Sequence, residues 1–240
     1  MSLAPSDESL LDNPVWHALR GPLSAFSEPG KGALRFVSDV GFFGAVERVD
    51  ADGWGQLARL VGEGGVAVLF RDEVPAPPVG WKEVYRGPTF QLVADDLDPV
   101  PEVETTPLGK GDVDEMLALT KLTEPGPFMA RTWELGGYIG MYERGRLIAM
   151  AGQRFSVPGH TEISAVCTHP DARRRGLAAA LTLVLARSIR ERGDEAFLHV
   201  LETNESALRL YLSIGFRVRR RMDVVAAQWG ESDTEAASPH

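Results

Sequence analysis

Residues 161–178 read TEISAVCTHPDARRRGLA, a run of mostly apolar or β-branched residues followed by a proline and a basic, glycine-containing turn. The run predicts a strand over 161–168 that ends before Pro170. Beyond the turn, apolar residues recur at helical spacing up to Gly193, a residue type that commonly ends helices. The segment therefore predicts a strand, a loop and a long helix in succession.

The start of this helix has the properties of an anion-binding site. The first N–H groups of a helix have no internal acceptor and carry partial positive charge. Gly176 and Ala178 keep bulky side chains away from these groups, and Arg173, Arg174 and Arg175 add full charges, which would otherwise be only a solvated charge run. The spacing matches neither GxxxxGK(S/T) nor GxGxxG, so we expect a different pyrophosphate-bearing ligand.

The segments around this helix predict an α/β (α+β) protein. Two proline-rich stretches, at 73–80 and 97–107, interrupt the chain, and the second is typical of a linker. We expect a smaller N-terminal α+β domain over 13–98, in which no residue pattern indicates chemistry, and a second domain over 101–227. The polar ends, 1–12 and 230–240, are expected to be disordered tails.

Composition excludes several classes of protein. The chain has 240 residues, with 34 acidic and 25 basic side chains and a net charge of −9, which disfavours a nucleic-acid partner. Its longest apolar stretch, 177–186, is too short to cross a membrane, and residues 1–10 do not resemble a secretory signal. With one cysteine and no paired histidine spacing, we expect a cytoplasmic protein without a disulfide, a metal or a membrane partner.

A second motif makes the first one recognisable. Residues 204–216 read NESALRLYLSIGF, and together with 161–178 they resemble the GNAT-type N-acetyltransferases. The loop pattern (Q/R)-x-x-G-x-(G/A) of that superfamily falls on Arg173, Gly176 and Ala178. The second pattern, N-x-x-A-x-x-x-Y-x-x-x-G-F, falls on Asn204, Ala207, Tyr211, Gly215 and Phe216. The strand EISAVCT is also similar to the glycine N-acyltransferase-like branch, in which a degenerate domain of the same fold precedes the catalytic one. This resemblance implies that residues 13–98 are a degenerate GNAT-like half, which would shape the acceptor side or an interface.

The resemblance implies a fold and an acyl-CoA site. The fold would have a mixed, mostly antiparallel central sheet, with one strand splayed from its neighbour so that its backbone can pair with the pantetheine arm. The residues implied in binding acetyl-CoA are Val166, Cys167, Thr168, Arg173, Arg174, Arg175, Gly176, Leu177, Ala178, Ala179 and Asn204. Asn204 is also expected to cap the next helix, and Cys167 is expected to be a buried small hydrophobe and not a nucleophile.

Three residues are candidates for proton transfer. The resemblance assigns Tyr211 as the donor to the departing CoA thiolate, although its spacing also fits a core aromatic. Glu162, at the start of the strand, is the first candidate for the base, since partial burial would raise the pKa of its carboxyl towards neutrality. His199, on the following strand, is the second candidate, and a structural, hydrogen-bonded histidine is its alternative.

The sequence thus predicts an acyl-CoA-dependent N-acyltransferase that moves acetyl from acetyl-CoA to a primary amine by direct attack in a ternary complex. The acceptor would be a small-molecule amine or a peptide N-terminus, and the protein a monomer or homodimer. A non-catalytic acyl-CoA binding or sensing module is the alternative. An aminoacyl-transferase that uses charged RNA is disfavoured by the net charge of −9.

Overall fold

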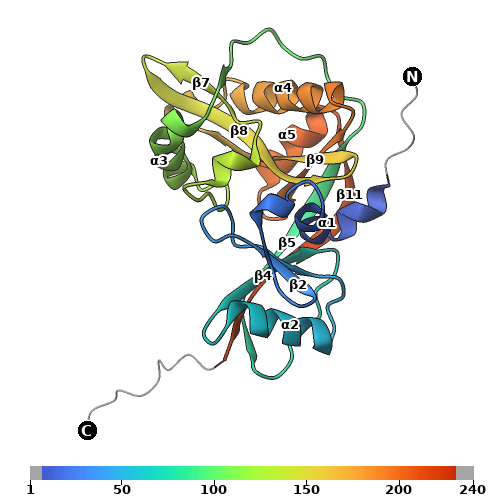
Figure 1. The fold of residues 1–240 in the computed structure, drawn as a ribbon. Helices are drawn as coiled ribbons and strands as arrows, with labels where there is room; N and C mark the ends of the chain where they lie inside the picture. The colour runs from blue at the N-terminus through green and yellow to red at the C-terminus, as the bar shows by residue number, and fades with distance from the viewer. Residues whose placement is uncertain (1–6, 231–240) are drawn as a thin grey trace.

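The computed structural model describes residues 7–230, which form a mixed α/β fold (Figure 1). The helices are α1 (Pro14–Arg20), α2 (Ala51–Val61), α3 (Val113–Thr123), α4 (Leu177–Glu191) and α5 (Glu205–Ser213). The strands are β1 (Ser27–Pro29), β2 (Ala33–Phe36), β3 (Gly44–Val46), β4 (Val66–Arg71), β5 (Trp81–Ala94), β6 (Thr106–Pro107), β7 (Ile139–Glu143), β8 (Arg146–Val157), β9 (His160–Thr168), β10 (Glu195–Leu201) and β11 (Phe216–Trp229).

Eight of the strands form one sheet in the order β4-β11-β5-β10-β9-β8-β7-β6. Neighbours in this sheet pair antiparallel except β9 and β10, which are parallel. Parallel neighbours need a crossover connection, and α4 supplies it. The expectation of a mixed, mostly antiparallel central sheet is confirmed.

The long strands β5 and β11 join the two halves of the chain. In Figure 1 they run from the region of α4 and α5 down to the region of α2. β5 belongs to the N-terminal half, yet it lies between β10 and β11 and is hydrogen-bonded to both. The predicted boundary between residues 98 and 101 therefore does not coincide with a break in the sheet.

Helices cover both faces of this sheet. Phe197 and Leu198 are neighbours on β10, so their side chains point to opposite faces. Leu198 packs in a core cluster with residues of α4 and α5, whereas Phe197 packs with α1 and with residues from β2 to β4. The segment from α1 to β3 thus packs on the face of the sheet opposite α4, whereas β4 and β5 belong to the sheet itself.

The structure differs from the expected N-terminal tail at residues 7–12. Glu8–Asp12 forms a 3-10 helix, and Leu11 within it is fully buried. Glu8 and Asp12 both form ion pairs with Arg219 of β11, which fix this segment to the sheet. The rest of the predicted tails, 1–6 and 231–240, lies outside the described residues. Within 7–230, no helix is long and apolar enough to cross a membrane.

Candidate active site

Strands β9 and β10 separate in the middle of the sheet. Their pairing ends at Ile163 and Leu198, although β9 continues to Thr168 and β10 to Leu201. Ala165 has a positive φ of 53°, and the register between β8 and β9 shifts around it, which is the geometry of a β-bulge. The splayed strand that the resemblance implied is therefore present, and its backbone beyond Ile163 has no partner on the β10 side within the described sheet.

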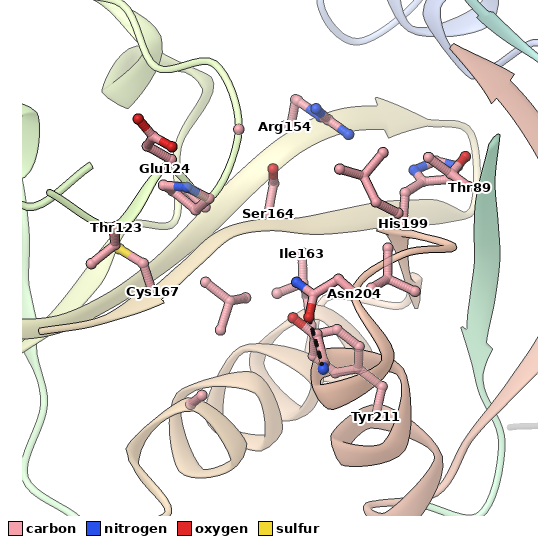
Figure 2. A pocket seen from close by; sticks show the side chains of 18 of the residues that line it. Thr89, Thr123, Glu124, Arg154, Ile163, Ser164, Cys167, His199, Asn204 and Tyr211 are labelled. Carbon is pink, nitrogen blue, oxygen red and sulfur yellow. Dashed lines mark hydrogen bonds between the residues drawn. The ribbon is translucent and has the colours of Figure 1, made fainter. Parts of the chain in front are cut away.

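The space between the separated strands is a cavity of about 880 Å³. Figure 2 shows Cys167, Asn204 and Tyr211 around it, with Arg154 and His199 further along. The predicted CoA-binding residues that line it are Val166, Cys167, Thr168, Arg173, Arg174, Gly176, Leu177, Ala178, Ala179 and Asn204. Arg175 does not line the cavity. Its side chain instead forms an ion pair with Glu143, with 3.1 Å between Nη2 and Oε1.

The start of α4 is shaped to accept an anion. Arg174 and Gly176 have positive φ values of 61° and 76°, which turn the chain sharply before Leu177. A Cβ at Gly176 would meet no other heavy atom within 4 Å, so the backbone there faces open space. The first N–H groups of α4, from Leu177 onward, are free of intrahelical acceptors. This loop fits a pyrophosphate group, and its residues would hold that part of CoA.

Thr168 and Cys167, near the end of β9, also line the cavity. The Thr168 hydroxyl is buried without a hydrogen-bond partner among the described residues, which is costly unless a ligand supplies one. Burial raises the pKa of the Cys167 thiol to about 11, although a hydrogen bond with Thr123 acts in the opposite direction. A thiol of that pKa stays protonated at neutral pH and is a poor nucleophile.

Helix α5 brings Asn204 and Tyr211 to the cavity. The Asn204 Oδ1 accepts a hydrogen bond from the Ala207 N–H at 3.1 Å, so its expected capping role is confirmed. Tyr211 is 7% exposed and lines the cavity. Burial raises the pKa of its phenol well above the usual range. Tyr211 therefore keeps its proton at neutral pH, and its hydroxyl is present as a hydrogen-bond donor to a negative charge that develops in the cavity.

The expectation for the pKa of Glu162 is wrong in direction. Burial alone would raise it, but the charges and hydrogen bonds of Arg154 and His199 outweigh burial and lower it to about 2. The Arg154 Nε and Nη2 donate to the two carboxylate oxygens at 2.8 and 2.6 Å. Glu162 is also absent from the lining of the cavity. It is an ionised partner of Arg154 and His199, not a carboxyl with a pKa near neutrality.

His199 lies on the cavity wall within a chain of buried polar side chains. Its Nδ1 is 2.7 Å from Glu162 Oε1, and its Nε2 is 3.0 Å from Gln91 Nε2. A carboxylate and an amide N–H at these two nitrogens select the neutral tautomer protonated on Nδ1. Burial lowers the pKa of His199, and Glu162 offsets this only in part. A β-bulge next to Arg219 lets that arginine complete the chain by donating to Gln91 Oε1 at 2.8 Å.

The N-terminal half provides one wall of the cavity, and sequence reasoning did not identify the residues that form it. Its residues are apolar or aromatic except for Thr89, and they come from the segment before β3 and from β4 and β5: Phe42, Phe43, Val68, Phe70, Tyr85 and Thr89. Arg154 of β8 lies against this wall, with its guanidinium carbon 5.1 Å from the Phe43 ring centre. The N-terminal half therefore forms part of the candidate site. No local motif marks these residues, because only the tertiary fold brings them together.

Metal ligands are not grouped in this region. Within residues 7–230, no three histidine, cysteine, aspartate or glutamate side chains are placed to hold one metal ion.

Comparisons with known proteins define the class to which this site belongs. A family model described as FR47-like protein matches residues 138–225, which include β8 to β10, α4 and α5. A solved GNAT-family acetyltransferase from Novosphingobium aromaticivorans is 38% identical to this chain. The match covers 92% of this chain and 98% of that one, with a TM-score of 0.82. The chain belongs to the GNAT family of acetyltransferases.

Two further matches add detail. A mycothiol acetyltransferase from Thermobispora bispora is 43% identical over 65 residues, but the match spans only 27% of this chain and 22% of the length of that protein. A GCN5-related N-acetyltransferase from Kribbella flavida is 18% identical over 96% of this chain and 98% of its own, with a TM-score of 0.65. The latter supports the fold alone.

Proposed function

We propose that this protein transfers the acetyl group of acetyl-CoA to a primary amine by direct attack within a ternary complex. The observation that carries the proposal is one continuous cavity that joins the anion-binding start of α4, the unpaired edge of β9 and the Tyr211 phenol. Binding both substrates side by side makes the reaction effectively intramolecular. The finer resemblance to the glycine N-acyltransferase-like branch stays a prediction.

The bond changes assign a role to the end of β9 and to Tyr211. A bond forms between the amine nitrogen and the acetyl carbon while the carbon–sulfur bond breaks. The backbone around Ala165 and Val166 is assigned to polarising the acetyl carbonyl, because β10 no longer pairs with β9 beyond Ile163. The Tyr211 hydroxyl gives its proton to the leaving thiolate. The protonated thiol of Cys167 favours direct attack over an acetyl-enzyme.

The proton of the amine is assigned to His199, with Glu162 as the residue that positions it. Glu162 holds the imidazole by Nδ1, which leaves Nε2 as the basic nitrogen. In this structure Nε2 accepts a hydrogen bond from Gln91, whose amide also donates to the Leu11 carbonyl at 2.9 Å. Transfer through His199 therefore requires the hydrogen bond with Gln91 to break.

The assignment of His199 predicts a change in the pH dependence of kcat/KM. Because burial lowers the pKa of His199, the wild-type acid limb is expected below pH 6.5, after correction for the fraction of unprotonated amine. The His199→Gln variant should flatten this limb. A variant that lowers the rate equally at every pH would instead identify His199 as structural.

The proposed function is tested by release of free thiol from acetyl-CoA in the presence of a panel of primary amines. Mass spectrometry of the products should show an added acetyl group on the amine. Longer acyl-CoAs serve as competitors for the donor site and are expected to react more slowly. Binding of acetyl-CoA without amine-dependent thiol release from any acceptor would contradict the proposal and favour a binding or sensing module.

A further inference from the structure

Arg154 is the charged side chain of the cavity wall that faces the N-terminal aromatic residues. The other charged groups that line the cavity are Arg173 and Arg174, at the start of α4, and Glu124, in the loop after α3. In Figure 2, Arg154 lies above Ser164 and Tyr211 lies below it. Arg154 is therefore placed to contact the acceptor and not the pyrophosphate.

The guanidinium of Arg154 pairs with Glu162 along one edge, and a second edge could bind a ligand. Nε and Nη2 face the Glu162 carboxylate, and among residues 7–230 no hydrogen-bond acceptor pairs with Nη1. Its flat face is covered, because the Phe155 and Phe43 ring centres lie 4.4 and 5.1 Å from the guanidinium carbon. The remaining Nη1–Nη2 edge presents parallel N–H donors, the geometry that pairs with both oxygens of a carboxylate.

The cavity wall that the N-terminal half and β11 provide is largely apolar. Phe42, Phe43, Val68 and Phe70 contribute rings and a branched side chain from the N-terminal half, and Val224 and Ala226 of β11 extend the same wall. A small, strongly hydrated acceptor would leave this surface in water, whereas an apolar side group would remove it from water. The wall therefore selects for a bulky apolar group next to the carboxylate.

Building on the proposed function, we propose that the acceptor is an amine that carries both a carboxylate and an apolar or aromatic side group. Arg154 binds the carboxylate through its Nη1–Nη2 edge, and the wall from Phe42 to Phe70 packs against the side group. Ordinary apolar α-amino acids have this chemistry. The N-terminal half would then determine which amine is acetylated.

The test compares acceptors that differ by one feature. L-phenylalanine and phenethylamine differ by the carboxylate, as do L-leucine and isoamylamine, and glycine lacks the apolar group. With acetyl-CoA as donor, kcat/KM for the better amino acid should exceed that of its decarboxylated partner and that of glycine by at least about tenfold. An equal or higher kcat/KM for both decarboxylated amines, or for glycine, would overturn the proposal.

Two pairs of variants assign the effect to residues. Arg154→Lys keeps a cation beside Glu162 but removes the forked edge, so the preference for the carboxylate should fall towards unity. Arg35→Lys is the matched control, because Arg35 pairs with Glu28 in the N-terminal half away from the cavity. Phe42→Ala should reduce the preference over glycine, whereas Phe26→Ala, a partly buried phenylalanine outside the cavity lining, should not. Unchanged preferences in Arg154→Lys would remove Arg154 from the acceptor site.

Calorimetric binding of the same amines in the presence of CoA separates this inference from the proposed function. If the amino acids bind more tightly than their decarboxylated partners but no acetyl group is transferred, the proposed function fails and the acceptor site stands. If transfer occurs without a preference for the carboxylate, the inference fails and the proposed function stands. The absence of both would overturn both.

Discussion

Tyr211 is positioned by packing, with its ring edge-on to Phe216 at 6.2 Å between ring centres. Phenylalanine preserves this packing, so Tyr211→Phe is expected to change stability and CoA affinity little. Because it removes the proposed proton donor, kcat should fall by about 10²- to 10⁴-fold. The measurement is steady-state turnover together with calorimetric CoA binding.

Tyr142→Phe is the matched control for Tyr211. Tyr142 donates a hydrogen bond to Asp112 at 2.9 Å and does not line the cavity. Its loss should leave kcat unchanged. Wild-type turnover in Tyr211→Phe would show that Tyr211 is only a core aromatic residue and would shift the assignment of the proton donor to another group.

The lowered pKa of Glu162 predicts how the stability of the fold depends on pH. Its pKa is lowered from 4.5 to about 2, so its ion pairing stabilises the fold above pH 4.5 and this contribution is lost as the pH falls towards 2. Glu162→Gln leaves Arg154 buried without its countercharge and should lower the free energy of unfolding by about 3 kcal/mol at pH 7. Urea unfolding at several pH values should show the difference from wild type shrinking below pH 4.5.

The comparison variant is Glu205→Gln, which removes an exposed ion pair with Arg209. It should change stability by no more than about 0.5 kcal/mol at any pH. A Glu162→Gln deficit that stays constant between pH 7 and pH 2 would mean that the charge of Glu162 contributes little.

At the residue scale, the sequence identified Glu162 and His199 but not their partners. The strand pattern predicted that both lie on neighbouring strands, which the pairing of β9 with β10 confirms. The partner Arg154 depends on the register of β8 against β9, which shifts between Gln153 and Ser156. Such irregularities cannot be recognised from the alternation of apolar residues. The direction of the Glu162 pKa shift therefore could not be predicted from the sequence.

At the scale of elements, helix α4 begins later than its sequence motif does. Arg174 and Gly176 have positive φ angles, so the first helical residue is Leu177. The sequence predicted a glycine-bearing helix start, because residue type alone signals it. The sequence could not predict that the Arg175 side chain forms an ion pair with Glu143 of β7, since that contact depends on how β7 packs.

The role of Gly176 in CoA binding can be tested with Gly193, at the other end of α4, as the control. Gly176→Val places a branched side chain in the open space that faces the cavity, so CoA affinity should fall at least about tenfold. Gly193 also has a positive φ, 93°, and open space around its Cβ position, and it lies at the C-terminal end of the same helix. Gly193→Val therefore shares the backbone strain but should leave CoA affinity unchanged.

Calorimetric titration with CoA measures both glycine variants, and thermal unfolding reports their strain. Equal affinity losses in the two variants would show that strain in α4, and not occlusion of the cavity, causes the effect. Unchanged affinity in Gly176→Val would remove the loop from 173 to 178 from the CoA site.

At the scale of the whole molecule, the sheet makes the two halves of the chain interdependent. The composition of the linker at 97–107 predicted a boundary, and no local pattern could show that β5 inserts between β10 and β11. Sheet order is set by long-range pairing, which a short window of sequence does not encode. The N-terminal aromatic residues reach the cavity only through the tertiary fold, which is why the sequence indicated that this half shapes the acceptor side or an interface but not which residues do so.

This interdependence predicts that residues 101–240 do not fold stably by themselves. Removing β5 leaves β10 and β11 with unpaired edges in the centre of the sheet. It also takes away Leu92 and Val93 of β5, which are at most 1% accessible and belong to two different core clusters of the intact protein. Unpaired buried edges and lost apolar burial each oppose folding. The fragment should therefore show no cooperative thermal transition and should not bind CoA, whereas co-expression with residues 1–100 should restore both. A fragment that melts cooperatively and binds CoA with the affinity of the full chain would show that residues 101–240 form an independent catalytic domain, and that the N-terminal half is only an addition to it.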